Sequence, residues 1–518
     1  MSQNKIMKNS AIVIVIIIIG KIFAFTRDIL VTSKFGATYS TDIYMFAIGI
    51  IFLLTTISYG LTTTFIPIHT KLLENEEISK DKKNEYVNNV INASALFTII
   101  LMVLGIIFAK YIVMGFAPGF QNNAMIYSNA IKIVRIMFLS LVFLSVQSVI
   151  TGVLQAHKQF YEPAAMSAAS CIVTILYLIF LSDRFGIYGF AFATVIGFIV
   201  QLIINIPKYK KLGYIYKFYI DFKDPGLSKL IRLMIPVIVS TSVVQLNLLV
   251  NRYFASTLYE GAVTALDLSN KLNIMMYEVF AIAISMVIYP TLSSLVANNN
   301  KEDYNNALIK AVNVILLITV PAAVAMGVLS YPIVSIIFRR GAFNNNSAQL
   351  TAMALTFYCP AMVAYGVRDV LNKAFYSIND SKTPMINSLI GILINILLDI
   401  LLIRNMAVSG LTMATSIAIS ITTIFLLISL KRKLKGIVLT KLYKSAGKIC
   451  ASSFLMGIAL LLINKLCIFK MGNTNKGNLI SLILCFVVGM LVYFQSIRIF
   501  KLEEYEYFID IIHKKFKK

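Results

Sequence analysis

Apolar runs of membrane-spanning length recur along the whole chain and decide its fold class. The first, AIVIVIIIIG at residues 11–20, continues without a turn signal into KIFAFTRDILVTSKFG. A helix needs about 20 mainly apolar residues to cross the hydrocarbon core of a bilayer. With 58% hydrophobic and 14% charged residues, the chain is therefore predicted to be an all-α polytopic membrane protein, and a soluble domain is excluded.

A hydropathy window of about 20 residues predicts fourteen transmembrane helices. They cover residues 9–34, 41–68, 87–115, 126–155, 160–182, 185–207, 228–256, 262–294, 305–338, 347–376, 383–403, 405–430, 444–466 and 478–499. No small-residue cleavage site follows the first run, which is therefore interpreted as a span and not as a signal peptide. The five cysteines lack paired spacing, which is typical of small core residues.

Lysine and arginine gather at the two chain ends and in the loops that follow even-numbered spans. These loops are 69–86, 156–159, 208–227, 296–304, 377–382 and 431–443, and the tail ends in HKKFKK. The positive-inside rule then places both termini in the cytoplasm. The net charge of +24 predicts attraction to anionic membrane lipids. The basic residues are scattered over loops without a recognised nucleic-acid-binding motif, which argues against nucleic acid as a partner.

An internal repeat is the most informative feature of the sequence. Matching landmarks recur at a nearly constant offset: Arg27 and Arg252, Gly36 and Gly261, Asp42 and Asp267, Pro67 and Pro290, Phe120 and Phe343, and Pro163 and Pro384. The repeat predicts a six-helix N-lobe at 1–218, a six-helix C-lobe at 219–437, and two additional helices with a basic cytoplasmic tail at 438–518. Six spans per repeat give both lobes the same direction, with a central cavity between them near the middle of the bilayer.

Ionisable residues inside predicted spans are costly, at roughly 2.5–3.5 kcal/mol each, and usually face a polar interior or pathway. On the eighth span, Asp267, Lys271 and Glu278 fall within about 40° of one another around a helix. The first span carries Lys21, Arg27 and Asp28. These groups either pair with one another structurally or line a functional lumen, and we favour the lumen because corresponding helices of both repeats are charged.

The cations favour an anionic ligand, and the membrane setting favours a lipid-linked one. Strings such as G-x-x-x-x-G-K-[ST], H-E-x-x-H and G-x-S-x-G do not occur in the chain. We therefore expect a transporter and not an enzyme, without a cofactor or a bound metal. The identity of a coupling ion stays open.

Several strings resemble the MurJ/MviN family of lipid II flippases, within the superfamily that also holds multidrug extruders. They are RDILVTSKFGATYSTDIYMFA, APGF, GVLQAHKQFYEPA, NRYFASTLYEGAVTALDLSNKL, FRRGAF and VLNKAFYSINDSKTP. The resemblance implies two six-helix lobes around a cavity, plus two helices that form a groove for a polyprenyl tail. It also implies alternating access that moves undecaprenyl-diphosphate-linked glycopeptide from the inner to the outer leaflet of the bacterial cytoplasmic membrane, beside the cell-wall synthesis machinery.

The resemblance also implies site residues. Arg27 and Asp28 match the family's Arg-Asp pair, Asp42 matches its span-two aspartate, and Lys21 and Lys271 stand where many members have arginine. The predicted diphosphate-binding set is therefore Lys21, Arg27, Arg252 and Lys271, and the predicted acidic gating set is Asp28, Asp42, Asp267 and Glu278.

One departure from the family pattern lies on the second span. Thr55-Thr56 replaces the family's paired arginines, and Tyr59-Gly60 replaces its Glu-Gly. Arg252 is the candidate substitute for the missing cation. The departure keeps a second interpretation open, a flippase for another polyprenyl-linked glycan. A cation-coupled drug exporter on the same fold and a membrane glycan polymerase are the other classes considered.

Overall fold

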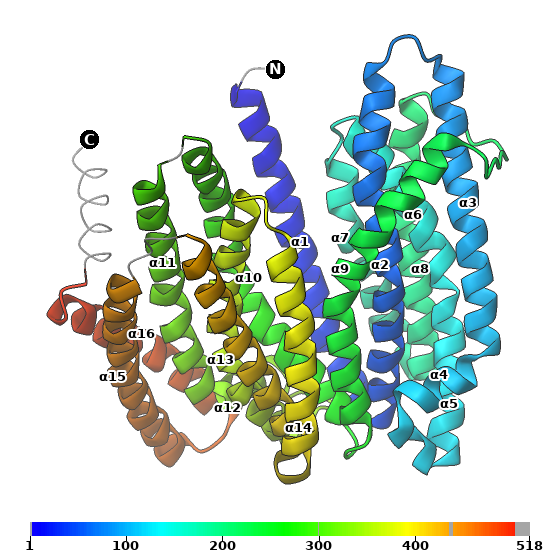
Figure 1. Ribbon diagram of the computed structural model, residues 1–518. Coiled ribbons are helices and arrows are strands. Elements are labelled where there is room, and N and C mark those ends of the chain that lie inside the picture. The colour runs from blue at the N-terminus through cyan, green and yellow to red at the C-terminus, as the bar shows by residue number, and fades with distance from the viewer. Residues whose placement is uncertain (1–2, 299, 435–438, 503–518) are drawn as a thin grey trace. The chain divides into compact units, whose positions relative to one another are not determined.

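The computed structural model describes residues 3–298, 300–434 and 439–502, and the side chains within 11–278, 288–298, 300–434 and 442–502. The regular structure of these residues is entirely helical (Figure 1). The helices are α1 (Gln3–Phe35), α2 (Tyr39–Glu74), α3 (Lys80–Ile107), α4 (Ala109–Phe116), the 3₁₀ helix η1 (Pro118–Asn122), α5 (Ala124–Phe138), α6 (Ser140–Ala156), α7 (Tyr161–Phe180), α8 (Ser182–Lys211), α9 (Pro225–Ser256), α10 (Ala262–Ala297), α11 (Lys301–Val328), α12 (Ser330–Phe338), α13 (Asn345–Ser377), α14 (Lys382–Lys433), α15 (Leu439–Met471) and α16 (Asn475–Ile499).

Packing divides the chain into two compact units. Unit 1 comprises residues up to Thr264 together with Arg340–Phe343, and unit 2 comprises Ala265–Arg339 and the chain from Asn344 onward. Helix α9, which the repeat assigns to the second half, packs along α2 in unit 1 (Figure 1). The boundary between the two compact units therefore differs from the boundary between the two sequence repeats.

Eleven helices among the described residues, with α5 and α6 counted as one, are long and apolar enough to cross a membrane, which confirms a polytopic membrane protein. Three predicted single spans are each built from two helices, with breaks at Phe108, Leu139 and Leu329. The break at Leu329 has a local cause, because Pro332 cannot donate the hydrogen bond that would continue α11 into α12.

Helix α14 contains two antiparallel arms joined at Ala407, where φ is +48°. The side chain of Asn387 on the first arm donates to the carbonyl oxygen of Thr422 on the second arm at 2.9 Å. The carbonyl of Leu402 also lies against Gly410, where a side chain would crowd it. The arms match the spans predicted at 383–403 and 405–430.

Left-handed backbone conformations recur at the spacing of the sequence repeat. Gly36 and Gly261, which the repeat pairs, both have positive φ. Lys158 and Asn379 form a second such pair, and Gly186 and Ala407 form a third with the same offset as the second. A positive φ is uncommon for a residue other than glycine, so matched pairs indicate that both halves turn at equivalent places.

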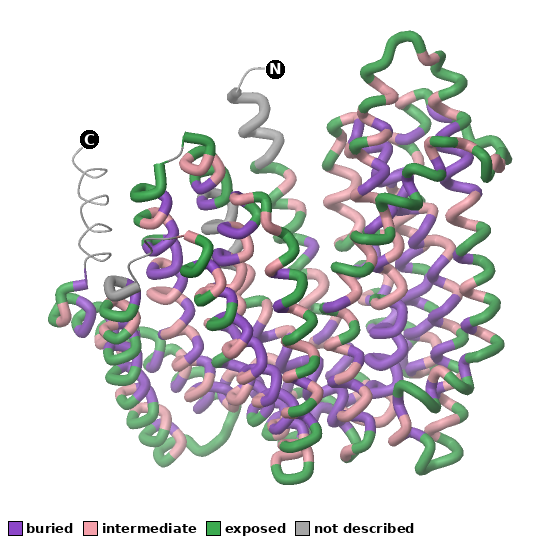
Figure 2. Tube along the Cα trace, in the orientation of Figure 1, coloured by how far each residue is buried: buried purple, intermediate pink, exposed green. Residues whose placement is uncertain are grey.

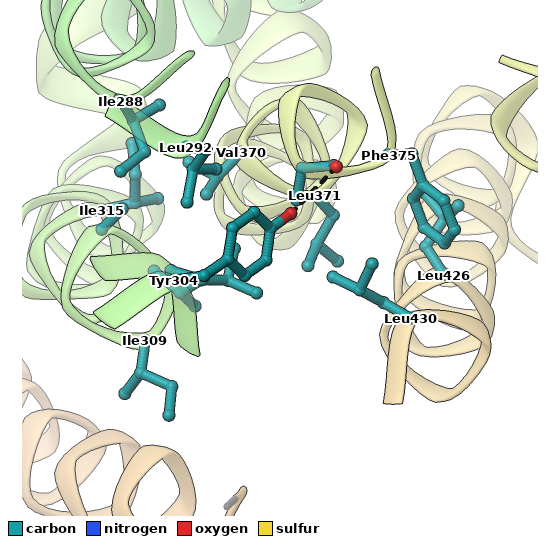
Figure 3. Packing of buried hydrophobic residues seen from close by; sticks show 14 of the residues in the cluster. Ile288, Leu292, Tyr304, Ile309, Ile315, Val370, Leu371, Phe375, Leu426 and Leu430 are labelled. Atoms are coloured by element: carbon teal, nitrogen blue, oxygen red, sulfur yellow. Dashed lines mark hydrogen bonds between the residues drawn. The ribbon is translucent and has the colours of Figure 1, made fainter. Parts of the chain in front are cut away.

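Each unit has its own core. In unit 1, apolar residues of α2, α3, α6 and α9 interlock, among them Phe65, Val87, Val149 and Leu230. In unit 2, Figure 3 shows side chains of α10, α11, α13 and α14 meeting around Tyr304, whose hydroxyl donates to the carbonyl of Ala374 at 3.0 Å.

Large apolar side chains also cover the outer faces of the helices. Examples of such exposed residues are Phe97, Phe192, Phe454 and Phe486. Figure 2 shows exposed positions alternating with buried ones along many helices. Exposed apolar surface on this scale fits contact with lipid, not with water.

Candidate functional site

The charged residues of α1 form a local pair. Nε and Nη2 of Arg27 donate to Oδ1 of Asp28 at 3.1 and 2.8 Å, and the two side chains are 24% and 10% exposed. Lys21, two turns earlier on the same helix, is exposed. Asp28 therefore holds the guanidinium of Arg27 in place while leaving some of its N–H donors for an anionic ligand.

Arg252 lies on α9 with its side chain against α2, and only 7% of the residue is exposed. Its guanidinium fills the space beside Gly49, where the methyl group of an alanine would overlap Nη1. Glycine at position 49 is thus what allows this arginine to lie between the two helices. Sequence reasoning selected Arg252 but missed Gly49.

Helices α2 and α9 touch again further along α2. Oγ1 of Thr56 and Oγ of Ser242 are hydrogen bonded at 3.0 Å. A side chain at Gly60 would meet Ile238 at 2.8 Å. Neutral Thr56 and small Gly60 on α2 therefore suit the close approach of α9. Thr55 and Tyr59, which also depart from the resembled family, have no such local explanation.

Asp42 caps the start of α10. Its Oδ2 accepts a hydrogen bond from the backbone N–H of Gly261 at 2.8 Å, and its Oδ1 accepts bonds from the N–H and the hydroxyl of Thr264 at 2.8 and 2.6 Å. The residue is 1% exposed. The first N–H groups of a helix have no partner within the helix, and a carboxylate satisfies them well.

Two further backbone contacts lie near this cap in unit 1. The N–H of Tyr39 donates to Oε1 of Glu260 at 2.9 Å, and the N–H of Ala342 donates to the carbonyl of Ser33 at 2.7 Å. Each joins a segment of the first repeat to a segment of the second. We call Asp42, Glu260 and Ser33 with these partners the cross-repeat latch.

The polar stripe predicted on the eighth span lies on α10 in unit 2. Asp267 and Asn270 are buried, whereas Lys271 is half-buried and Glu278 is also partly covered. Nearby, the ring of Tyr277 stacks on that of Tyr365, with 5.8 Å between the ring centroids. Burial of both signs of charge within one apolar helix fits a polar interior.

Unit 2 also holds a cavity of about 930 Å³ that is lined almost entirely by apolar side chains. Helices α11, α12, α15 and α16 supply most of the wall, including Pro321, Ala325, Leu460, Gly489 and Tyr493. Sequence reasoning anticipated an apolar groove only through the family resemblance. The individual wall residues carry no distinguishing signal, because every helix here is rich in leucine and isoleucine.

Comparison with known proteins points in one direction. The family model described as "Lipid II flippase MurJ" matches residues 31–498. A "Probable lipid II flippase MurJ" of Buchnera aphidicola subsp. Schizaphis graminum is 30% identical over 445 residues, 84% of this chain and 85% of that protein. The "Lipid II flippase MurJ" of Burkholderia cenocepacia is 24% identical over 424 residues, covering 80% and 82%.

Solved structures agree. A structure titled "Lipid II flippase MurJ, inward closed conformation" superposes with a TM-score of 0.78 at 26% identity, covering 95% of this chain and 98% of that one. An inward-facing multidrug resistance MATE family transporter of the MOP superfamily gives 0.67 at 14% identity, covering 83% and 99%, and shares the fold alone.

Proposed function

The chain belongs to the MurJ family of lipid II flippases, and from this premise we propose how its residues bind and move the lipid. Its function is that of a lipid II flippase in peptidoglycan biosynthesis, and it is a multi-pass membrane transporter, not an enzyme.

The topology we propose has fourteen spans with both termini in the cytoplasm. Eleven candidate helices would span the membrane, and counting α14 as two arms makes twelve. Helices α1 and α10 bring the number to fourteen. The basic loops support the orientation. The paired left-handed residues support two six-helix repeats, at 1–218 and 219–437, which enclose a central cavity, with two further helices after them.

We assign the lipid's diphosphate to Lys21, Arg27, Arg252 and Lys271. Hydrogen bonds between a charged donor and phosphate are roughly twice as strong as neutral ones, and arginine can supply two at once. The half-buried Arg27, oriented by Asp28, is the strongest candidate on geometric grounds. Asp267 and Glu278 would balance the charge of Lys271 when the cavity is empty.

The observation that carries the proposal furthest is the apolar cavity of unit 2. Its walls come from α11 and α12 together with α15 and α16, the two helices beyond the repeat. A cavity of about 930 Å³ whose lining is apolar apart from Lys310 suits a long isoprenoid chain, which offers no hydrogen bonds and gains free energy from leaving water. Among the described lining residues there is no carboxylate that could pair with a drug cation.

Movement of the lipid from the inner to the outer leaflet would follow alternating access. The cross-repeat latch, which includes the Asp42 cap, would close the outward end during loading and break when the cavity opens outward. The latch has few hydrogen bonds. A bound lipid that favours the outward-open state over the closed state by about a few kcal/mol would therefore be enough to shift the equilibrium between them.

The decisive test is rescue of a bacterial strain depleted of its only lipid II flippase. Expression of this chain should restore growth and the appearance of lipid II in the outer leaflet, with Arg27→Ala as the inserted but inactive control. Failure of the wild-type chain to rescue, with normal membrane insertion, would favour a different polyprenyl-linked glycan. Increased drug resistance without rescue would favour the exporter.

A further inference from the structure

A second cavity, in unit 1, lies between the α2–α3 turn and the first turns of α9, with a volume of about 650 Å³. We propose that it binds the phosphate-bearing head group of an anionic phospholipid from the cytoplasmic leaflet. The site is separate from the residues assigned to the transported lipid. The proposed phospholipid site therefore does not depend on which lipid the flippase transports.

Four lysines face this cavity: Lys71, Lys82, Lys83 and Lys229. Nζ of Lys83 donates to the carbonyl of Leu73 at 3.2 Å. Across the described side chains, the other three ammonium groups have neither an ion pair nor a hydrogen bond. Three unneutralised lysines converging on one cavity make a site for an anion.

Two carboxylates also line the cavity, and one of them is already engaged. Oδ1 of Asp224 caps α9 by accepting from the N–H of Gly226 at 2.7 Å, and its Oδ2 accepts from the side chain of Asn89 at 3.1 Å. Glu85 is exposed and is the only other acid among the described lining residues. Cations thus remain in excess over acids at the cavity.

Apolar side chains form much of the remaining wall, which favours a lipid over a free anion. Pro67, Ile68, Leu72, Ile78 and Leu233 contribute side chains. On α9, Leu233 follows Lys229 by one helical turn, and it is 45% exposed. The wall therefore changes from cationic to apolar along the helix, as the head group and acyl chains of a phospholipid require.

The depth of the cavity in the bilayer is indicated by the segment that precedes α9. Residues 215–222 read IYKFYIDF, and Phe218 and Phe222 are 80% and 63% exposed. Aromatic side chains mixed with lysine are typical of the membrane–water interface. Tyr219 of the same segment lines the cavity, so the cavity opens at interfacial depth.

Four asparagines of α3 hold this segment in place. Asn88 and Asn84 donate to the carbonyl of Ile215 at 2.9 and 2.8 Å, and Asn92 donates to the carbonyls of Lys217 and Tyr219 at 3.1 Å each. Asn89 donates to the carbonyl of Asp221 at 2.8 Å. The aromatic side chains are consequently presented outward by a fixed backbone, and the cavity wall is preformed.

The test uses the absence of tryptophan from the chain. Leu233→Trp places a single tryptophan in the cavity, and the full-length protein is reconstituted in phosphatidylcholine vesicles. Dibrominated phosphatidylglycerol, which quenches tryptophan on contact, is compared with dibrominated phosphatidylcholine. We expect the anionic lipid to be preferred several-fold at this cavity tryptophan. We expect no preference in Phe97→Trp, whose tryptophan lies on the exposed face of α3 outside the cavity.

The cavity variant, Lys71→Gln with Lys82→Gln and Lys229→Gln, should bring the several-fold preference at the cavity tryptophan close to one, because lysines near a membrane surface attract anionic lipid. The matched variant, Lys80→Gln with Lys210→Gln and Lys211→Gln, removes the same charge elsewhere in unit 1 and should retain the preference. Equal loss in both variants, or no preference in the parent, would overturn the proposal. So would abolition of the preference by inorganic phosphate at constant ionic strength, which would indicate a site for free anions.

Discussion

Asp42 and Thr264, 222 residues apart in the sequence, are joined by two hydrogen bonds in which the carboxylate accepts from both the backbone N–H and the hydroxyl of the threonine. With the third bond from Gly261, one buried side chain of the first repeat satisfies the start of the helix that carries Asp267 and Lys271. Loss of the Asp42 carboxylate would therefore remove all three hydrogen bonds. The gating role of Asp42 stays a prediction.

Removing the charge of Asp42 should destabilise this cap. Asp42→Asn replaces one acceptor oxygen with an NH₂ group facing an N–H donor, and should cost about 1.5–3 kcal/mol. Thr264→Val removes only the hydroxyl donor and should cost about 1 kcal/mol. Thermal unfolding of the purified protein in detergent measures both. The double variant should lose less than the sum, and strict additivity would contradict the direct pairing.

Gly49→Ala should mimic the loss of Arg252. The added methyl group overlaps the guanidinium and forces it out from between α2 and α9. We expect Gly49→Ala and Arg252→Ala to abolish rescue of the flippase-depleted strain to a similar extent. Gly115→Ala is the control, since nothing lies within 4 Å of that position. Full rescue by Gly49→Ala would show that the observed position of Arg252 is dispensable.

The diphosphate assignment predicts a charge requirement at two helices. Arg27→Ala and Lys271→Ala should each abolish rescue while the proteins still insert, whereas Lys271→Arg should be tolerated because it keeps the charge. Outer-leaflet lipid II, measured beside membrane levels of each variant, separates transport from insertion. An active Arg27→Ala variant would remove this residue from the binding set.

A bulky residue inside the apolar cavity should block the polyprenyl tail. Ala325 lines the cavity, so Ala325→Trp should fill part of its volume and stop rescue without preventing insertion. Leu462→Trp makes a comparable change on α15 at a side chain that is exposed and lies outside the cavity wall, and it should be neutral. Equal activity of the two variants would argue that the tail takes another path.

His157, in the turn between α6 and α7, should make stability pH-dependent. Burial lowers the pKa of His157 below its ordinary value of 6.5, and its Nε2 is hydrogen bonded to the Tyr214 hydroxyl at 2.9 Å. The folded state binds a proton at His157 less readily than the unfolded state does. The contribution of neutral His157 to the free energy of unfolding is therefore complete above about pH 6.5 and is lost as the pH falls below that value. Thermal unfolding between pH 8 and 5 should show a steeper decline for the wild-type protein than for His157→Gln. Parallel curves would exclude His157 as a cause.

Periodicity and hydropathy made the helical, membrane-spanning class predictable, because a bilayer forces every spanning segment to satisfy its own backbone. The repeat in the sequence likewise anticipated the paired turns at Gly36 and Gly261. The breaks at Phe108 and Leu329 were not predicted, since hydropathy averages over the few residues where a helix changes direction.

The sequence by itself determined three things: the class of protein, the positions of ionisable residues within membrane-spanning helices, and the family to which the chain belongs. Only the tertiary structure decided that Asp42 caps α10, that Gly49 admits Arg252, and that α15 and α16 complete an apolar cavity in unit 2. The reason is physical. Hydropathy and charge are properties of single residues, whereas a cap, a close approach and a cavity are relations between residues that only the packing of helices brings together.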